Sequence, residues 1–527
     1  MTAQHSVTPA PPSPTHDDNS RDRDGHDHEA YDPGARVHDA QNSDAHNPGA
    51  RVHDAHDDSH IHDIVGIGIG PFGLGLAALS DPLPDVDAVF LDQREEFRWH
   101  PGMMIEGATI QVPFLADLVT MADPTSPYSF LQFLKDRERL YPFFIRESFY
   151  PLRAEYDEYC RWVAAQLRTL RWNRTVTSVT NDGGIYRIIA EVTDASGRII
   201  DIETYRAKHV VLGVGTAPVL PSALQALTSG DAEPTGKCPV IHTADYLANR
   251  ERLLAAGSVT IVGSGQSAAE IYRDLIEDAE DRGVSVDWIT RSPRFFPMEY
   301  TKLTLEMTSP EYTDHFRALP DDLRGRIGRE QRSLYKGISA DLIDDIHDTL
   351  YRLSRGGRRL LTTLVTDAEL ISARPAEATA GYALTFRSAV LGQTFTRSAG
   401  AVVAATGYRA GVPAFLGPLG SEIRRDRDGR LDISRDYTVN AAGTIHALGI
   451  EEHTHGVTGP DLGFGPWRAS VVLSQVTGRE PYPIERSIAF QTFGIPGTEA
   501  AAEPDRPTEE TAHAADEPIR TKEMTHA

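Results

Sequence analysis

Cysteine is nearly absent from this sequence. Its 527 residues include two, Cys160 and Cys238, which lie far apart and form no CxxC pair. So few thiols fit a reducing compartment, and their separation excludes a dithiol redox relay and the disulfide reductases that use one. No apolar run reaches the about 18 residues of a membrane span, and no basic leader precedes an apolar segment. We therefore expect a cytoplasmic protein without a signal peptide or membrane segment.

Positive charge is also in short supply. Lys and Arg number 52 against 76 Asp and Glu, which gives a formal net charge of −24 at pH 7. The sequence has no basic stripe to neutralise phosphates, so we expect no binding of nucleic acid. The main consequence of the negative charge is solubility.

Large apolar side chains are scarce at both ends of the chain. Residues 1–62 hold ten of the 20 histidines and contain a repeat, at 32–40 and 47–55. Such segments cannot offset their ordering entropy by burial, so 1–62 and 497–527 are predicted to be disordered tails. The His-Asp pattern is compatible with loose Zn²⁺ or Ni²⁺ binding, but its irregular spacing favours plain disorder, and we predict no metal site.

What the sequence does contain is two glycine-rich turns. The first, Gly68-Ile-Gly70-Pro71-Phe-Gly73, follows the apolar run 64–69 and precedes the helix-competent segment 74–79. In this context the backbone N–H groups of a helix start can hold a pyrophosphate. The next apolar run, 86–91, ends in Asp92, and an acid about 20 residues after the glycines suits a ribose hydroxyl. The first turn therefore predicts a dinucleotide without a 2′-phosphate, namely FAD.

The second turn differs in the charge that follows its next strand. Gly263-Ser264-Gly265-Gln266-Ser267-Ala268 lies between the strand-like run 259–262 and a helical segment, 268–276. The following strand, 286–290, ends in Arg291, with Arg294 nearby, and a cation suits the 2′-phosphate of NADPH. One such motif is a weak signal, but two in matching contexts predict an α/β fold with two Rossmann-like dinucleotide-binding domains.

The order of the remaining patterns indicates how these domains are connected. A strand at 209–212 runs into Gly213-Val-Gly215-Thr216, and a similar strand at 401–404 runs into Thr406-Gly407-Tyr408. Because the two segments bracket the second turn, the NADPH domain is predicted to be inserted into the FAD domain. The predicted parts are 63–235 (FAD domain), 236–395 (NADPH domain with substrate-site segments) and 396–496 (FAD domain and substrate-site closure). A helix is expected at 154–170 and strands at 175–180, 186–192 and 199–205, while the aromatic, proline-rich segment 97–150 packs on the cofactor, the substrate cavity or the core.

Several motifs together resemble a known family. They are Asp92–Met104 with Trp99-His100-Pro101-Gly102-Met103, Gln111, Asp123–Phe130, Gly263–Ser267, Ala405–Tyr408 and His453-Thr-His455-Gly456. Throughout the folded body the chain is similar to the flavin-dependent N-hydroxylating monooxygenases of siderophore biosynthesis. The resemblance implies that NADPH reduces FAD, that reduced flavin and O₂ form a C4a-hydroperoxide, and that a neutral primary amine attacks its distal oxygen to give an N-hydroxyamine and water.

The resemblance also implies which residues hold the cofactors, with a homo-oligomer as the assembly. It implies FAD contacts at the first turn (Gly68, Gly70, Pro71, Gly73) and at Asp92, Trp99, His100, Gln111, Pro460, Asp461 and Leu462. It implies NADPH contacts at Gly263, Ser264, Gly265, Gln266, Ser267, Arg291, Gly337 and Ser339, and further cofactor contacts at Val176, Thr406 and Gly407. For His100, His453 and His455 a purely structural, hydrogen-bonding role is equally open. No catalytic side chain is assigned, because an amine with a pKa of about 10.4 needs a sheltered, desolvating site rather than an acid triad.

Two departures from the family pattern bear on the substrate. The amino-acid hydroxylases are expected to hold the substrate α-carboxylate with a lysine in a Phe-Leu-Lys-Asp run and an asparagine in an Asn-Glu run. Here these runs read Phe114-Leu-Ala116-Asp117 and Leu305-Glu306. A diamine needs no carboxylate clamp, and its distal ammonium would suit Glu306, Glu299 or Asp117, with Gly463 also at the substrate site. The alternative is that Lys302 or Lys336 binds a carboxylate instead.

The leading hypothesis is an NADPH- and O₂-dependent N-hydroxylase of cadaverine or putrescine, with L-lysine next and L-ornithine third. A carbon- or sulfur-oxygenating flavin monooxygenase is disfavoured, because its Phe-x-Gly-x-x-x-His signature is not matched at Gly236 and His242. A non-catalytic flavin- or NADPH-binding sensor stays open until turnover is measured.

Overall fold

The computed structural model describes residues 59–228, 239–376 and 380–496. Gly236, Cys238 and most of the two predicted tails lie outside these described residues. The first strand, β1 (Ile61–Ile67), begins before the predicted boundary at 63, because Ile61 and His62 already pair with Arg206 and Ala207 of a neighbouring strand. The segment 1–62 is therefore not disordered at its last two residues.

A seven-stranded sheet forms the first domain, in the order β3-β2-β1-β6-β5-β4, with β17 pairing along β6 as well. The strands after β1 are β2 (Ala88–Asp92), β3 (Leu170–Trp172), β4 (Arg174–Asp182), β5 (Ile185–Thr193), β6 (Ile199–Leu212) and β17 (Ile445–Ala447). Strands β1, β2, β3, β6 and β17 are parallel, whereas β4, β5 and the first half of β6 form an antiparallel meander.

The parallel strands of this sheet are buried on both faces, which explains their nearly continuous apolar runs. On one face Ile64 and Phe90 join a cluster with the helices α1 (Pro71–Ser80), α4 (Arg153–Ala164) and α14 (Gly465–Thr477). On the other face Val65 and Leu91 pack with residues of the meander and of the 3₁₀ segment η4 (Ala414–Glu422). The sheet is thereby held rigid where β1 ends at the first glycine turn.

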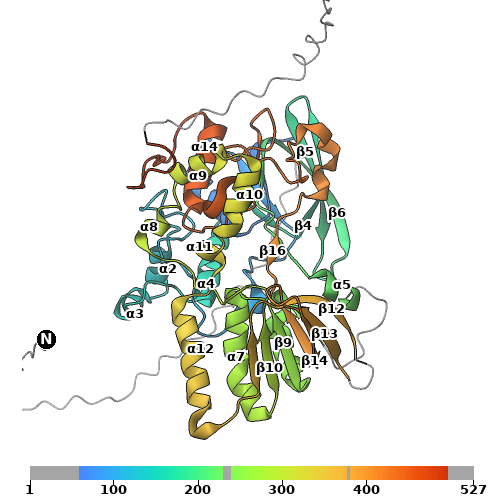
Figure 1. The fold of residues 1–527 in the computed structure, drawn as a ribbon. Coiled ribbons are helices and arrows are strands. Elements are labelled where there is room, and N and C mark those ends of the chain that lie inside the picture. The colour runs from blue at the N-terminus through green and yellow to red at the C-terminus, as the bar shows by residue number, and fades with distance from the viewer. Residues whose placement is uncertain (1–58, 229–238, 377–379, 497–527) are drawn as a thin grey trace, which may run out of the picture. The chain divides into compact units, whose positions relative to one another are not determined.

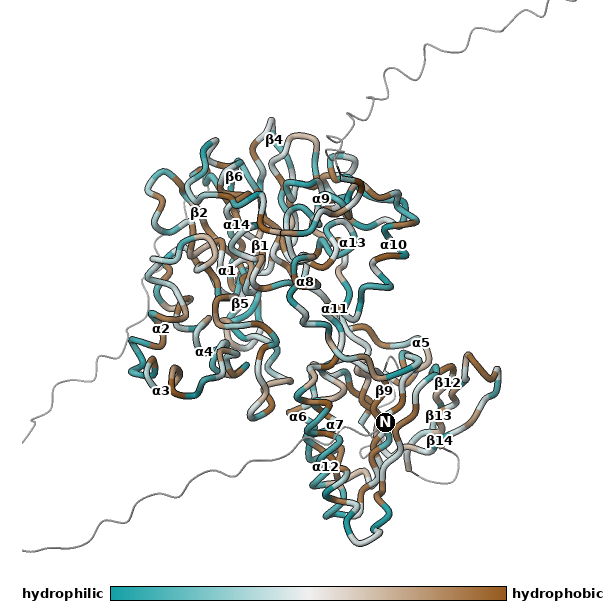
Figure 2. Tube along the Cα trace, turned by 60° about the vertical axis from the view of Figure 1, so that its left-hand side comes forward, coloured by the Kyte–Doolittle hydropathy of each residue, from teal (hydrophilic) through white to brown (hydrophobic). Residues whose placement is uncertain are grey.

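A second sheet, of five parallel strands, forms the second domain in the order β11-β10-β9-β15-β8. Its strands are β8 (Val240–His242), β9 (Ser258–Val262), β10 (Ser285–Ile289), β11 (Thr362–Val365) and β15 (Ala401–Ala404). Helices α6 (Tyr246–Ala255) and α7 (Gln266–Arg282) pack on it, and α12 (Ala340–Leu353) packs beside α7 (Figure 1). Next to this sheet lies the three-stranded antiparallel sheet β12 (Glu369–Pro375), β13 (Tyr382–Arg387) and β14 (Thr394–Ala399). Figure 2 shows hydrophobic residues along β9 and mixed colours along α12, as expected for a buried strand and a surface helix. The predicted fold of two Rossmann-like domains is confirmed.

The domain boundary at 395 is wrong. Strand β15 pairs with β9, so residues 401–404 occupy a central position in the second sheet and not a place in the first domain. The two crossings between the domains instead meet as a short antiparallel ribbon, in which Tyr408 pairs with Pro218 and Arg409 with Ala217. This ribbon, β7 (Ala217–Pro218) with β16 (Tyr408–Arg409), marks the insertion that the sequence predicts.

Residues 302–336 return to the first domain although they lie between strands of the second. They form α8 (Lys302–Leu305), α9 (Pro310–Ala318), α10 (Asp321–Glu330) and α11 (Ser333–Lys336), which lie with α14 in the upper part of Figure 1. Tyr312 and Phe316 of α9 pack on Val457, just after α13 (Glu452–His455). The predicted range 236–395 thus contains a segment that packs on the first domain.

The remaining helices are short. They are α2 (Phe130–Asp136), α3 (Leu140–Ile145), α5 (Ser222–Thr228) and the 3₁₀ turns η1 (Pro101–Met103), η2 (Thr243–Asp245), η3 (Arg355–Gly357) and η5 (Gly456–Thr458). Among the described residues, no helix combines the length and the apolar character that crossing a bilayer requires.

Two predicted elements differ in extent. The helix expected at 154–170 ends at Ala164, and Leu170 begins strand β3. The strands expected at 199–205 and 209–212 are one strand, β6, because residues 206 and 207 continue to pair with β1 although Arg206 and Lys208 interrupt the apolar pattern.

Candidate functional site

The first glycine turn joins β1 to α1 through three glycines in different surroundings. A Cβ on Gly68, whose φ is +101°, would lie 2.4 Å from the carbonyl oxygen of Gly213, and one on Gly73 would lie 2.2 Å from that of Gly68. A Cβ on Gly70 would meet nothing nearer than Gly213 O at 4.0 Å. The outer glycines therefore allow close backbone packing and the middle one leaves space for a ligand, as a dinucleotide fingerprint requires. Within the described residues no side chain caps α1, and Pro71 occupies its first turn, so its free N–H groups suit a pyrophosphate.

The second turn repeats this division of roles. A Cβ on Gly263, whose φ is +139°, would lie 2.0 Å from the carbonyl oxygen of Ala405, whereas one on Gly265 would meet only Lys336 O at 3.6 Å. Ala268, in place of a third glycine, is fully buried. Helix α7 likewise has no side-chain cap in the described part of the chain. The geometry fits a second pyrophosphate at the start of α7.

The predicted NADPH residues outside the turn lie beside it. The backbone N–H of Ser339 donates to Gln266 Oε1 at 2.9 Å. A Cβ on Gly337 would lie 2.6 Å from Pro297 O, so glycine is needed there for close packing. Ser264 Oγ lies 2.8 Å from Ser292 Oγ, and Ser267 is half-buried in the first turn of α7.

Arg291 is placed as a phosphate ligand would be. It directly follows β10 and Thr290, its side chain is exposed, and no ion-pair partner of it occurs among the described residues. Its assignment to a 2′-phosphate stays a prediction.

Asp92 is held by the protein itself. Oδ2 accepts hydrogen bonds from Ile69 N at 2.7 Å and Arg94 Nη2 at 2.8 Å, and Oδ1 accepts from Arg94 N and Nε. Burial alone would raise the pKa of Asp92, but the hydrogen bonds and charge of Arg94 outweigh it and hold the pKa below its usual value. Both carboxylate oxygens of Asp92 thus already accept hydrogen bonds within the protein, and the ribose contact stays a prediction.

The Trp99-His100 segment lies between the two domains. Trp99 N donates to Asp157 Oδ1 at 2.8 Å, and the His100 ring lies 5.4 Å from Trp99 and 5.7 Å from Tyr408. His100 has a left-handed backbone (φ 48°) and keeps an exposed edge. Desolvation of the rest of its ring, with the charges of Arg153 and Arg94, lowers the pKa of His100 to about 4, so the ring is neutral at pH 7.

Pro101 to Met103, the second half of the Trp-His-Pro-Gly-Met motif, pack against the second domain. A Cβ on Gly102 would lie 1.8 Å from the carbonyl oxygen of Ala244 in the second domain. Met103 is buried in the core cluster of the second domain, although its position in the chain is within the first. The motif therefore serves as a packing joint, and a cofactor contact by Trp99 or His100 stays a prediction.

Four other predicted cofactor residues have local partners. Gln111 Nε2 donates to Thr109 O at 3.2 Å. Val176 packs in the cluster under η4 at a register shift of β4. Thr406 Oγ1 donates to Val219 O, and Gly407 O accepts from Val219 N at 3.0 Å. Thr406 and Gly407 thus fix the interdomain ribbon.

The loop from Pro460 to Leu462 is anchored by a buried ion pair. The guanidinium of Arg468 and the carboxylate of Glu451 are 1% and 0% exposed and bind each other through Nη1 and Oε1. Arg468 Nη2 also donates to Asp461 O at 2.9 Å, and Arg468 Cζ lies 4.0 Å from the centre of the Phe72 ring. Asp461 Oδ1 accepts from Phe464 N at the start of α14. The Arg468–Glu451 pair thus joins the loop at 460–462 to α1, the helix that begins at the first glycine turn and carries Phe72.

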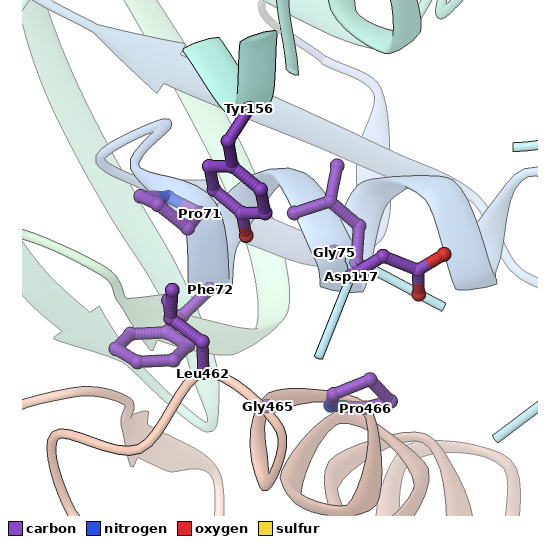
Figure 3. Close-up of a pocket in the computed structure, with 9 residues that line it drawn as sticks. Pro71, Phe72, Gly75, Asp117, Tyr156, Leu462, Gly465 and Pro466 are labelled. Carbon is purple, nitrogen blue, oxygen red and sulfur yellow. The ribbon is translucent and has the colours of Figure 1, made fainter. Parts of the chain in front are cut away.

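Figure 3 shows a narrow pocket at this junction. Its walls come from α1, α4, the segment around residue 117 and the start of α14, and are Pro71, Phe72, Gly75, Asp117, Leu118, Tyr156, Leu462, Gly465 and Pro466. Most of these side chains are apolar, and the hydroxyl of Tyr156 points into the space between them. The pocket borders the first glycine turn, but its free volume of about 10 Å³ holds no more than one water molecule, so its lining marks a closely packed apolar junction and not a substrate cavity.

Ala116 and Gly463, two of the residues predicted for the substrate site, lie close together, and their substrate role stays a prediction. A Cβ on Gly463 would lie 3.4 Å from Ala116 Cβ. Asp117, in contrast, does not fit the predicted role of binding an ammonium. Its carboxylate accepts hydrogen bonds from Val119 N, Thr120 N, Thr120 Oγ1 and Phe130 N at 2.6–3.0 Å, and it points away from the pocket in Figure 3. The predicted role of Asp117 as an ammonium ligand is wrong, because its carboxylate already accepts hydrogen bonds from its own loop and from Phe130 N.

The second pair of predicted substrate residues lies on α8. Leu305 is 48% exposed. Glu306 Oε2 accepts from the backbone and side-chain nitrogens of Gln491, which lower the pKa of Glu306. Glu299 is exposed and accepts from Ser333 Oγ at 2.8 Å. Glu299 and Glu306 remain candidate ammonium ligands.

Lys336 is not free to bind a carboxylate. Its Nζ lies 2.7 and 2.9 Å from the two carboxylate oxygens of Glu452, and Tyr335 Oη donates to the same group at 2.8 Å. Burial would raise the pKa of Glu452, but Lys336 and Tyr335 lower it overall. Of the two lysines considered, Lys302 alone is left as an alternative clamp, since it has no ion-pair partner in the described ranges.

The His-Thr-His-Gly motif is structural in its contacts. His453 Nε2 lies 2.8 Å from Leu431 O, and His455 Nε2 lies 3.3 Å from Arg435 O. The His455 ring is fully buried, stacks on Tyr437 at 4.6 Å, and has its pKa lowered well below the usual value by burial. For these two histidines the structural interpretation is favoured.

Sequence reasoning missed the ion pairs that hold the site. Arg153 pairs with Glu270, and Arg468 with Glu451, over separations of 117 and 17 residues. The available signal was a charged residue on the apolar face of a helix. Such a residue predicts an ion pair, because an unpaired buried charge is strongly destabilising.

Comparison with known proteins adds the identity of the family. Residues 60–410 match the model of the family L-lysine 6-monooxygenase/L-ornithine 5-monooxygenase. The chain is 44% identical over 470 residues to a putrescine N-hydroxylase of Shewanella oneidensis, covering 88% of this chain and 90% of that protein. It is also similar to the crystal structure of DfoA bound to FAD, the cadaverine monooxygenase of Erwinia amylovora, with a TM-score of 0.78, 44% identity and coverage of 84% of this chain and 100% of that one.

A more distant structure carries both cofactors. It is the Kutzneria ornithine N-hydroxylase with reduced FAD, NADP⁺ and L-ornithine, with a TM-score of 0.70, 26% identity and coverage of 80% of this chain and 99% of that one. The resemblance inferred from the motifs is thereby confirmed. The chain belongs to the L-lysine 6-monooxygenase/L-ornithine 5-monooxygenase family.

Proposed function

We propose that this protein uses FAD, NADPH and O₂ to N-hydroxylate one terminal amine of an aliphatic diamine, putrescine or cadaverine, for a hydroxamate siderophore. The observation that carries the choice of substrate is the pair Ala116 and Leu305, where the sequence offers no cation or amide for an α-carboxylate. The 44% identity to a putrescine N-hydroxylase and to a cadaverine monooxygenase supports it, against 28% to an L-lysine N6-monooxygenase and 32% to an L-ornithine N(5)-monooxygenase.

The two glycine turns are the proposed cofactor sites. Gly70 and the start of α1 would hold the pyrophosphate of FAD, and Gly265 and the start of α7 that of NADPH, with Arg291 on its 2′-phosphate. Bound FAD, once reduced by NADPH, supplies the activation of O₂. The other predicted cofactor contacts, among them Trp99, Gln111, Ser339 and Leu462, are also part of this proposal.

The chain's own task is to position a neutral amine and to exclude water. An alkylammonium has a pKa of about 10.4, so a site that accepts the amine must disfavour its charge by desolvation. Phe72, Leu462 and Tyr156 make the surroundings of the first turn apolar, although the cavity of Figure 3, at about 10 Å³, does not itself have room for a diamine. Glu299 or Glu306, outside this pocket, would hold the distal ammonium that stays charged.

The ion pair of Lys336 with Glu452 strengthens the diamine proposal. Lys336 Nζ lies 2.7 Å from the carboxylate of Glu452, so a substrate carboxylate would have to share or displace that partner. The L-lysine alternative therefore depends on Lys302, which makes it testable with one variant.

The test is NADPH oxidation coupled to detection of the hydroxylamine product, with FAD, across putrescine, cadaverine, L-lysine and L-ornithine. We expect product with the diamines and little with the amino acids. Preference for L-lysine, lost in Lys302→Ala, would instead establish the alternative clamp. Without N-hydroxylated product from any amine, the proposal fails and a non-catalytic binding role gains support.

A cytoplasmic location and a homo-oligomeric state complete the proposal. The first rests on the scarcity of cysteine, and the second on the family resemblance alone. Light scattering on the purified protein measures the second directly.

A further inference from the structure

Two histidines and an aspartate come together at the end of β1 that lies away from the glycine turn. His60 Nε2 lies 2.5 Å and His62 Nδ1 3.1 Å from Asp87 Oδ2, and the two imidazole rings are 4.6 Å apart. One ligand atom from each residue falls within 4.8 Å of the others, and no other such group of three occurs among the described residues.

The strands bring these side chains together. His60 directly precedes β1 and His62 is its second residue, and residues two apart along an extended chain point to the same side. Asp87 immediately precedes β2, which is parallel to β1 with Ile64 beside Ala88. The backbone of Asp87 is fixed, because its carbonyl accepts from Asp63 N at 2.8 Å and Ile64 N at 3.1 Å while its N–H donates to Asp63 Oδ2 at 3.0 Å.

The donor set suits a borderline transition ion. Two imidazole nitrogens and one carboxylate oxygen bind Zn²⁺ at about 2.0–2.2 Å, which places tetrahedral ligand atoms about 3.3 Å apart. The atoms present need only small side-chain rotations to reach that spacing. A hard ion such as Mg²⁺ prefers oxygen ligands and is not favoured.

The surrounding charges leave Asp87 available to a cation. The nearby ammonium, Lys208 Nζ, lies 2.7 Å from Asp63 Oδ1 and is paired there. His60 is about half exposed, so an ion can enter from solvent and keep water as its fourth ligand.

We propose that His60, His62 and Asp87 form a site for a divalent transition metal, Zn²⁺ or a similar ion, that joins the first two strands of the FAD-type domain. Gly68 is six positions after His62, which at about 3.3 Å per residue is about 20 Å. The ion is therefore remote from the cofactor turn and stabilises the fold rather than taking part in oxidation. The proposal does not depend on the amine that the enzyme uses.

Thermal unfolding of the full-length, FAD-loaded protein with added Zn²⁺ tests it. An ion that binds only the folded strands raises the Tm progressively with the logarithm of the free Zn²⁺ concentration, by on the order of a few degrees at about 100-fold excess over Kd. Ions held by the sequence before β1 do not give this shift if they bind the folded and unfolded chain alike. Mg²⁺ is expected to leave the Tm unchanged.

Variants assign the shift to the three residues. His60→Ala, at an exposed side chain, and Asp87→Asn are expected to lose the Zn²⁺-dependent rise. The matched controls His347→Ala, an exposed histidine beside acids on α12, and the double variant His26→Gln/His28→Gln are expected to keep it. No rise in the unmodified protein, or a rise that survives His60→Ala, would overturn the site; if Asp87→Asn alone misfolds, His60→Ala decides.

Discussion

Arg153 of α4 and Glu270 of α7 form a buried, two-pronged ion pair between the two domains. Nη1 lies 2.8 Å from Oε2 and Nη2 lies 2.6 Å from Oε1, with side chains only 11% and 5% exposed. Arg153 Nη1 also donates to Met103 O at 2.8 Å, and Glu270 Oε1 accepts from Gln266 of the second glycine turn at 3.0 Å. One network thus joins the interdomain packing motif to the proposed NADPH site.

Removing one partner of this pair is expected to cost more than removing both. Glu270→Ala leaves a buried guanidinium unpaired and should lower the free energy of unfolding by about 3–5 kcal/mol. The double variant Arg153→Met/Glu270→Leu removes both charges and should recover most of that loss. Urea unfolding followed by flavin fluorescence measures the free energy of unfolding of the two variants. Equal losses in both would show that an unpaired buried charge is not the source of the cost.

The glycines of the second turn should separate stability from cofactor use. Gly263→Ala places a Cβ 2.0 Å from Ala405 O at a φ of +139°, and we expect a loss of about 2–4 kcal/mol in the free energy of unfolding. Gly265→Ala has room in the protein, so its stability should stay nearly unchanged while its KM for NADPH rises about tenfold, equivalent to 1.4 kcal/mol of binding. Similar Tm losses in both variants would contradict the assignment of Gly265 to the pyrophosphate.

The fold could be predicted from the sequence where its signals are local. A strand, a glycine turn and a helix within about 20 residues are enough to place β1, α1 and Asp92, and the same holds for β9 and α7. The position of β15 could not be placed in this way, since Ala401 to Ala404 is an apolar run that fits either sheet. Its pairing with β9 is a contact across about 140 residues.

The candidate site was predictable only in part for a similar reason. Ala116 and Gly463 were identified from motifs, and the structure places them in contact. Asp117 was misassigned because its partners include Phe130 N, which is brought near by a loop that has no periodicity. A motif therefore identified the region of the site, but not which acid in it is already hydrogen-bonded.

Two buried histidines should make the protein sensitive to mild acid. Burial lowers the pKa of His446 from 6.5 to about 3 and that of His455 well below 6.5. Below pH 6.5 the unfolded chain takes up protons that the folded protein refuses, so stability is expected to fall with pH by up to about 1.4 kcal/mol per unit for each histidine. Urea unfolding between pH 7.5 and 5.5 measures the slope. His446→Gln should reduce the slope by the contribution of one histidine, which is less than half of the total because burial also lowers the pKa of His100, His242 and His453. His347→Gln, at an exposed position, should not change the slope.

Restoring the carboxylate clamp should reverse the substrate preference. Ala116→Lys with Leu305→Asn supplies the two groups that the amino-acid hydroxylases of the family are expected to use. The new ammonium would attract the α-carboxylate of L-lysine and repel the distal ammonium of a diamine. Both effects raise the preference for L-lysine over the diamine. We expect the ratio of kcat/KM for L-lysine to that for cadaverine to rise at least tenfold, a change of about 1.4 kcal/mol.

Size must be separated from charge in that experiment, because Ala116 is 6% exposed and packs on Gly463. Ala116→Met with Leu305→Asn has nearly the same bulk and no charge, and it should lower the activity with both substrates without changing their ratio. If the methionine variant shifts the ratio as far as the lysine variant does, shape rather than charge selects the amine. If neither shifts it, the α-carboxylate does not approach residue 116, and the substrate must then lie closer to Lys302 and Glu306 on α8, where the same pair of measurements can be repeated.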